Sequence, residues 1–224
     1  MPAPRRSQLP RRGAAPSGPY YRAVTFRGWP SEALEFYEGL EADNSKTYWT
    51  AHLDFYEKQV REPMRELLAE LEPEFGTGKI FRPYRDVRFS KDKSPYKTHL
   101  GAWLDMGGYL QLSAEGLAAG CGVYQMDKEQ LDRYRRAVVD DRAGAELAAI
   151  AGQVAVHGHG SLKTAPRGYD KDHPRADLLR HKGLTTWQQW EPAAWLGTAA
   201  AKKRIVDFLR ASRPLKDWLD TNVR

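Results

Sequence analysis

The hydrophobic period of this chain changes twice, and that order limits the folds open to it. Residues 31–76 place apolar side chains such as Phe36 and Leu40 at helical spacing. Over residues 80–123 the period becomes alternating, and after Asp127 it becomes helical again. One block of strands between helices favours an α+β fold over repeated βαβ units. We therefore predict an antiparallel sheet of about five strands, with helices from the N- and C-terminal segments packed against it.

The first predicted strand is IFRPYRDVRF, residues 80–89. Alternation puts Phe81, Val87 and Phe89 on one face and the polar residues on the other. Arg85 falls on the apolar face by this count. Either a β-bulge shifts the phase, or the side chain of Arg85 is buried with a partner.

The remaining elements follow the same two periods. Residues 99–124 predict a meander of strands with a tight turn at Gly107 and Gly108. Residues 183–190 predict one more strand. The last helical pattern is expected to divide into two helices near Pro214, because proline interrupts helical hydrogen bonding.

Basic charge is concentrated in the first nineteen residues, which hold four arginines, five prolines and no acidic residue. Such a segment buries too little apolar surface to offset its ordering entropy. We expect residues 1–19 to be a disordered tail and residues 20–224 to be a single domain. The formal net charge of +6 falls to +2 without the tail's arginines. A balanced domain disfavours nucleic acid as a partner, although the tail could add weak, salt-sensitive contact.

Several classes of protein are disfavoured by what the sequence lacks. No apolar run approaches the ~20 residues of a membrane span. The tail has no apolar core of a secretory signal, and one cysteine permits no internal disulfide, so we expect the cytoplasm. No phosphate-loop glycine pattern and no cysteine-based zinc site are present, so no cofactor is predicted. The oligomeric state stays open.

Charge is concentrated a second time in YRDVRFSKDKSPYKTHL, residues 84–100. From Arg82 to Lys97 six residues are basic and two are acidic. Guanidinium groups bind carboxylate or phosphate in a two-point geometry, and Asp86 could orient one of them or act as a base. We therefore predict an anionic small-molecule site with Asp86 as the candidate catalytic residue. The predicted ligand-binding residues here are Arg82, Arg85, Arg88, Lys93, Tyr96 and Lys97.

Two other interpretations of this stretch stay open. Alternating charges are typical of a solvated strand face, where exposed ion pairs contribute ~0–1 kcal/mol. Alternatively, the charges form a buried ion-pair network in a protein that works through partners. Mutual pairing of Arg85, Asp86 and Arg88 in an empty site would count against ligand binding.

A second candidate segment is PRGYDKDHP, residues 166–174. If it forms a wall of the same cleft, Arg167, Tyr169 and Asp170 complete the anion site. Oxygen and nitrogen ligands suited to a divalent metal are offered by Asp170, Asp172 and His173. Ligands so close in sequence rarely converge without a known loop pattern, so a structured turn is favoured and no metal is predicted.

Histidines and glycines mark two further places. His157 and His159 would share a face on a strand and suit a metal, but their flanking glycines favour a turn. Cys121, between Gly120 and Gly122, is expected on the core face of its strand. Glycines on the opposite face would let a ligand approach the backbone closely.

The charged run also has the form of a signature: Arg82-x-x-Arg85-Asp86-x-Arg88-Phe89, then Lys93-Ser94-Pro95-Tyr96-Lys97. This pattern resembles that of a bacterial family of unknown function, numbered 2461. The resemblance covers most of the chain after the tail, including Asn44, Trp49, Gly120, Gly122 and residues 166–174. It implies that the charged run is a family hallmark, and it implies no activity, because the family is uncharacterised. Only Asn44 stands where the family has paired asparagines, so Asn44 receives little functional weight.

Overall fold

Six strands form one antiparallel sheet in the order β1-β2-β3-β4-β6-β5 in a computed structural model that describes residues 25–224. The strands are β1 (Gly78–Ile80), β2 (His99–Leu104), β3 (Gly108–Ser113), β4 (Gly116–Val123), β5 (Val156–His159) and β6 (Gly183–Trp190). The α+β class is confirmed, with six strands in place of about five. The expected tail, residues 1–19, lies outside the described residues.

Among the described residues, seven α-helices pack around this sheet. They are α1 (Glu32–Ala42), α2 (Lys46–Phe55), α3 (Glu62–Phe75), α4 (Lys128–Val139), α5 (Asp141–Gln153), α6 (Ala176–Leu179) and α7 (Ala200–Asn222). A π-helical turn η1 (Tyr56–Arg61) joins α2 to α3, and a 3-10 turn η2 (Ala194–Gly197) precedes α7. No helix within residues 25–224 is long and apolar enough to cross a membrane.

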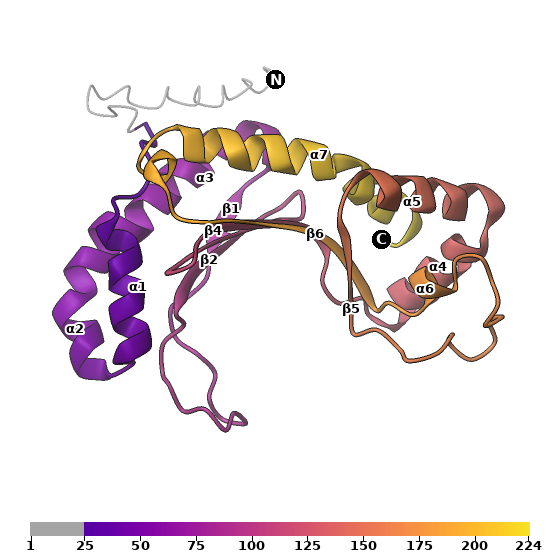
Figure 1. Ribbon diagram of the computed structural model, residues 1–224, viewed down its shortest axis with the longest axis horizontal. Coiled ribbons are helices and arrows are strands. Elements are labelled where there is room, and N and C mark those ends of the chain that lie inside the picture. The colour runs from indigo at the N-terminus through magenta and orange to yellow at the C-terminus, as the bar shows by residue number, and fades with distance from the viewer. Residues whose placement is uncertain (1–24) are drawn as a thin grey trace, which may run out of the picture.

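One face of the sheet, called here the covered face, carries the core. Alternation directs Leu100, Leu110 and Leu112 to this face, and all three are buried. Helix α7 runs along this side of the sheet (Figure 1), and its Leu209 joins the same hydrophobic cluster. The predicted turn between β2 and β3 is present, and Gly107 takes a φ of 87° there, which suits glycine.

The helices gather at the two ends of the sheet (Figure 1). Helices α1 to α3 pack with strands β1 to β4 in one hydrophobic cluster, and α4 to α6 pack with the end of α7 in a second. Helix α7 joins both, through Leu209 in the first cluster and Leu215 in the second. The predicted break at Pro214 is wrong: the helix continues through it, because burial on both sides outweighs the ~3 kcal/mol that an interior proline costs.

The predicted strand over residues 80–89 is also wrong beyond Ile80. Residues 81–98, called here the charged loop, leave the sheet between β1 and β2 and extend away from it (Figure 1). Pro83 has no N–H to give to a β-ladder, and the loop pairs with itself through one bridge, between Tyr84 and Tyr96. No strand phase therefore governs the direction of Arg85.

Candidate functional site

The charged loop is closed at its root by backbone hydrogen bonds. The N–H of Arg85 donates to the carbonyl of Pro95 at 2.9 Å, and the N–H of Lys97 donates to the carbonyl of Pro83 at 2.8 Å. These two bonds fix the two arms of the loop against each other where they leave the sheet. The side chains near the root are therefore held in defined positions.

Tyr96 anchors this root in the core. Its ring is buried and stacks on Trp49 of α2, with centroids 4.5 Å apart and planes 10° apart. Asn44 binds both backbone groups of Tyr96: its Oδ1 accepts from the N–H at 2.9 Å, and its Nδ2 donates to the carbonyl at 3.1 Å. Asn44 and Trp49 thus position the loop, and the low weight given to Asn44 from the sequence missed this role.

Most charges further out along the loop bind one another. Arg88 donates to both oxygens of Asp86, at 2.9 Å and 2.7 Å, and Arg85 forms an ion pair with Asp92. The side chains of Arg88 and Asp86 are 77% and 47% exposed, so this pair lies in solvent. Lys93 donates to the backbone carbonyl of Val87 at 3.0 Å. Hydrogen bonds from Arg88 lower the pKa of Asp86, which favours its unprotonated form.

Four cations of the loop, Arg82, Lys91, Lys93 and Lys97, form no ion pair within residues 25–224. Of these, Arg82 and Lys97 lie close enough for their charges to interact. The ammonium of Lys97 lies 5.3 Å from the centre of the Phe81 ring, and burial together with the charge of Arg82 lowers its pKa. Next to it, burial and the charge of Lys97 lower the pKa of His99. Positive groups are thus brought together here, although the charge of Arg82, after the hydrogen bonds from Arg88, also acts on Asp86 and lowers the pKa of that carboxyl.

A recess of about 370 Å³ opens beside this cluster. It is lined by Glu41, Asn44, Arg85, Asp92, Ser94, Tyr96, Lys97, Thr98 and His99. Arg85 reaches the recess with 30% of its side chain exposed, already paired with Asp92. Lys97 and His99 are the basic groups in this lining without a carboxylate partner among the described residues.

The face of the sheet opposite the covered face, called here the open face, carries rings in place of aliphatic side chains. In the strand register Trp103 lies opposite Tyr109, Tyr109 opposite Gly120, and Gly120 opposite Trp187, so all four share this face. Phe81 lies next to Tyr109, with ring centroids 6.3 Å apart. None of the described helices crosses the open face (Figure 1).

A second recess, of about 460 Å³, lies on the open face. Two ring pairs line it, together with the glycines of β4: Tyr109 with Trp187, Tyr124 with His159, and Gly120 and Gly122. The Nε2 of His159 is within 2.7 Å of the Thr185 hydroxyl, and burial lowers the pKa of this histidine. At the β4 glycines, the Trp187 ring lies against Gly120 and the backbone of Leu184 and Thr185 lies against Gly122; the expected approach of a ligand stays a prediction.

The second predicted segment, residues 166–174, lies at the other end of the molecule from the charged loop (Figure 1). Tyr169 packs against the second hydrophobic cluster, whereas Tyr96 belongs to the first. The structure does not bring Arg167, Tyr169 and Asp170 to the charged loop. The Asp170 carboxylate accepts from the N–H of Asp172 at 2.9 Å, as in a structured turn.

No group of three metal-ligating side chains comes together within the part of the chain that the structure describes. Nδ1 of His173 accepts from the backbone N–H of Arg175 at 3.0 Å. The expected turn at His157 and His159 is instead strand β5, which pairs with β6. His159 is there bound to Thr185, and His157 is exposed.

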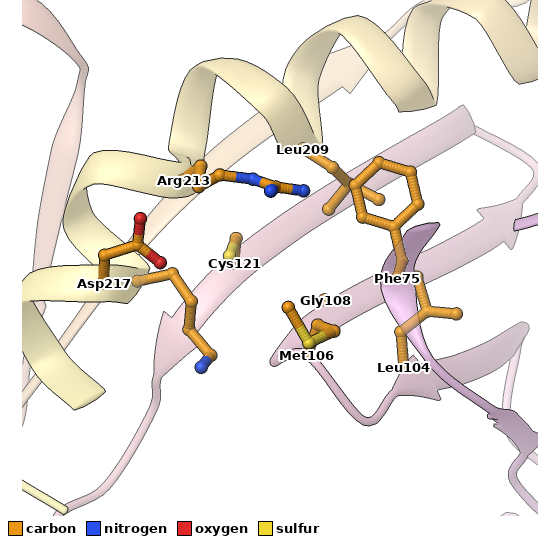
Figure 2. Close-up of a pocket in the computed structure, with 9 residues that line it drawn as sticks. Phe75, Leu104, Met106, Gly108, Cys121, Leu209, Arg213 and Asp217 are labelled. Atoms are coloured by element: carbon orange, nitrogen blue, oxygen red, sulfur yellow. The ribbon is translucent and has the colours of Figure 1, made fainter. Parts of the chain in front are cut away.

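A small cavity of about 20 Å³ lies between the covered face and α7 (Figure 2). It has room for about one water molecule. Cys121 and Gly108 reach it from the sheet, and Arg213 and Asp217 reach it from α7. Burial raises the pKa of the Cys121 thiol to about 11, so the thiolate needed for nucleophilic chemistry is disfavoured.

Comparisons with known proteins give one family. The model of an uncharacterised family, described as conserved hypothetical protein (DUF2461), matches residues 32–218. A search of curated proteins gives no match. A solved structure of a conserved hypothetical protein from Pyrococcus furiosus is 12% identical, with a TM-score of 0.36, over 74% of this chain and 98% of that chain. A likeness this weak says nothing about function.

Proposed function

The chain belongs to the DUF2461 family, whose description states no activity, and we propose from the geometry that it binds an anionic ligand at the root of the charged loop. Lys97 and Arg82 hold the anion, and His99 lies beside them. The observation that carries the proposal is the position of Lys97: among the loop cations without a carboxylate partner in the described residues, it alone lines the recess.

Positive charges at Arg82, Lys97 and His99 repel one another when they lie close together. Burial, and after it the charge of Arg82, lowers the pKa of Lys97; burial, and after it the charge of Lys97, lowers the pKa of His99. A bound anion would relieve both repulsions, and it would favour the charged form of each group. Positive groups arranged against one another in this way are typical of a site whose negative member is the ligand.

The root is also the rigid part of the loop. Asn44 binds both backbone groups of Tyr96, directly before Lys97, and Trp49 stacks on its ring. The backbone from which Lys97 projects is therefore ordered before binding, which lowers the cost of ordering this segment around a ligand. The candidate base Asp86 already accepts two hydrogen bonds from Arg88, which weakens it as a base, so the proposal is limited to binding and leaves turnover open.

We place this binding in the cytoplasm. The chain's single cysteine, Cys121, is buried and unpaired, which suits a reducing compartment. Small molecules that carry phosphate or carboxylate groups are the ligand class that fits one lysine and one arginine side by side.

Calorimetric titration of the full chain with inorganic phosphate and with citrate tests the proposal. Lys97→Ala and Arg82→Ala should each weaken binding by about tenfold, since a charge-assisted hydrogen bond contributes ~1.5–3 kcal/mol. Lys91→Ala is the matched control, because Lys91 is an exposed lysine of the same loop outside the root. If neither anion binds, or if all three variants bind equally well, the proposed function is wrong.

A further inference from the structure

The open face presents a row of rings on alternate strands of the sheet. Phe81 follows β1, Tyr109 lies on β3 and Trp187 lies on β6, with centroids 6.3 Å and 6.0 Å apart along the row. Phe81 and Trp187 are 38% and 37% exposed, which is high for large apolar rings. Beyond Trp187, the row continues to the ring pair of Tyr124 and His159 in the same recess.

Two glycines let these rings lie over the strands. A Cβ on Gly120 would come within 2.9 Å of the Trp187 ring. A Cβ on Gly101 would come within 2.9 Å of the Tyr109 hydroxyl and 3.2 Å of the Phe81 ring. The rings therefore occupy the space that side chains would fill, close against the backbone. Their outer surfaces are left to face solvent.

The sheet beneath this row holds no acidic residue. None of the six strands contains Asp or Glu, although the chain has 29 acidic residues. The polar groups on the open face are neutral or basic, among them Lys79, Gln111, Thr185 and His159. At the Phe81 end the row meets Lys97, whose ammonium lies over that ring. The strands therefore present no carboxylate to a negatively charged ligand, and acidic residues come close at the Lys97 end, where Glu41 and Asp92 line the recess.

We propose that the open face binds single-stranded nucleic acid, with successive bases on Phe81, Tyr109 and Trp187 and a backbone phosphate at Lys97. This inference rests on the proposed function, since the phosphate occupies the proposed anion site. Exposed rings on a helix-free sheet stack unpaired bases without regard to sequence, and adjacent cations hold the phosphates. The small net charge of the domain sets a modest electrostatic contribution, so stacking provides most of the affinity.

The length of the row of rings favours single-stranded nucleic acid over a free nucleotide or a duplex. A free nucleotide has one base and would leave most of the row uncovered. In a duplex the bases are paired and stacked on one another, so their faces are not accessible to the rings. A single strand presents several unstacked bases and one phosphate per base, which fits a row of rings that ends at a lysine.

Fluorescence anisotropy of the full chain with labelled oligo-uridine and oligo-deoxythymidine of about 15 nucleotides tests the inference. We expect binding that weakens as salt rises. Trp187→Ala should weaken it by about tenfold, and Trp187→Phe should restore most of the loss, since one base–ring stack is removed and returned. Phe89→Ala is the matched control, because this ring is 97% exposed but lies far out on the charged loop.

A second variant guards against unfolding of Trp187→Ala. Gln111 lies on the open face, and its Oε1 accepts from the Tyr109 hydroxyl at 3.1 Å. Gln111→Glu keeps that acceptor and adds the carboxylate that the face lacks. We expect it to weaken oligonucleotide binding severalfold with an unchanged melting temperature.

The outcomes separate this inference from the proposed function. Phosphate binding that depends on Lys97, with no oligonucleotide binding at low salt, overturns the inference alone. Oligonucleotide binding that is equal in wild type, Trp187→Ala and Gln111→Glu also overturns it. If uridine monophosphate or a duplex binds as tightly as the single-stranded oligonucleotide, the inference is also overturned, because the row of rings then does not favour a single strand. If Lys97→Ala leaves phosphate binding intact, the proposed function itself fails.

Discussion

The two faces of the sheet are built from the same strands but differ in what they stabilise. The covered face carries Leu110 and Leu112, fully buried in the first hydrophobic cluster, on the side of the sheet along which α7 runs (Figure 1). The open face places Tyr109 and Gln111, their neighbours in β3, on the side that no described helix crosses. The first face provides folding stability through burial. The second contributes little to the core, so its rings are free to serve another purpose.

Two adjacent residues of the charged loop, Tyr96 and Lys97, serve the two faces differently. Tyr96 is buried against Trp49 and belongs to the core cluster. Lys97, the next residue, lies over the ring of Phe81 on the open face. The charged loop is therefore anchored on the covered face by Tyr96, and it presents Lys97 to the open face. Substitutions on each side should separate stability from binding.

The largest expected effect is on the covered face. Leu110→Ala should lower the free energy of unfolding by ~2–5 kcal/mol, because it leaves a cavity in a fully buried site. Gln111→Ala, one residue along on the open face, should change it by only about 1 kcal/mol, because a single hydrogen bond from the Tyr109 hydroxyl is lost. Urea denaturation measures both. Equal losses in the free energy of unfolding would mean that the open face contributes to the core as much as the covered face does.

The next effect concerns the anchor of the charged loop. Asn44→Ala should cost ~1–3 kcal/mol, because both backbone groups of Tyr96 lose their partner. Asn44→Asp keeps the acceptor and loses the donor, so its loss should be smaller. Thermal unfolding ranks the two variants. A melting temperature unchanged in both would show that Asn44 does not hold the loop.

A smaller effect concerns pH. Burial and Lys97 lower the pKa of His99 below its usual value of 6.5, so the unfolded chain takes up this proton more readily than the folded one. This histidine therefore favours unfolding as the pH falls below 6.5, and the penalty disappears above it. Proton NMR should give His99 a pKa below 6.5 that rises with phosphate. A pKa insensitive to both phosphate and Lys97→Ala would contradict the proposed site.

The smallest effect is expected in the exposed part of the loop. Arg88→Ala removes the pair with Asp86 in solvent, and the melting temperature should stay close to that of the wild type. The pKa of Asp86 should rise toward its ordinary value of 3.8, because the hydrogen bonds from Arg88 hold it down. Carbon-detected NMR of the carboxylate measures this. A large drop in melting temperature would revive the interpretation as a structural ion-pair network.

The alternating period predicted the sheet where residues pair with neighbouring strands. It located β2, β3, β4 and β6, because burial of one face imposes alternation. It failed over residues 81–89, where charge and aromatics alternate but Pro83 opens a loop that pairs with itself. Pro214 predicted a break that does not occur, because burial of Leu209 and Leu215 on either side of it keeps α7 continuous.

The candidate site was predictable only in part. Composition located the charged loop, but no local pattern shows which cations have partners. Arg85 binds Asp92 seven residues away, whereas Lys97 has no carboxylate partner among the described residues and lies over the Phe81 ring. The open face required strand register, since Tyr109 and Trp187 are far apart in sequence and meet only across Gly120. Its one sequence signal was the pair of glycines around Cys121.

Two tryptophans of β6 provide the most direct test, because they lie on opposite faces of one strand. Trp187 is on the open face, whereas Trp190 packs edge-on against Phe208 of α7, with centroids 5.9 Å apart. Nitrogen–proton NMR of the indole groups should show the Trp187 signal shifting as oligo-uridine is added, with Trp190 unmoved. A shift of Trp190 alone, or of neither, would contradict the assignment of binding to the open face.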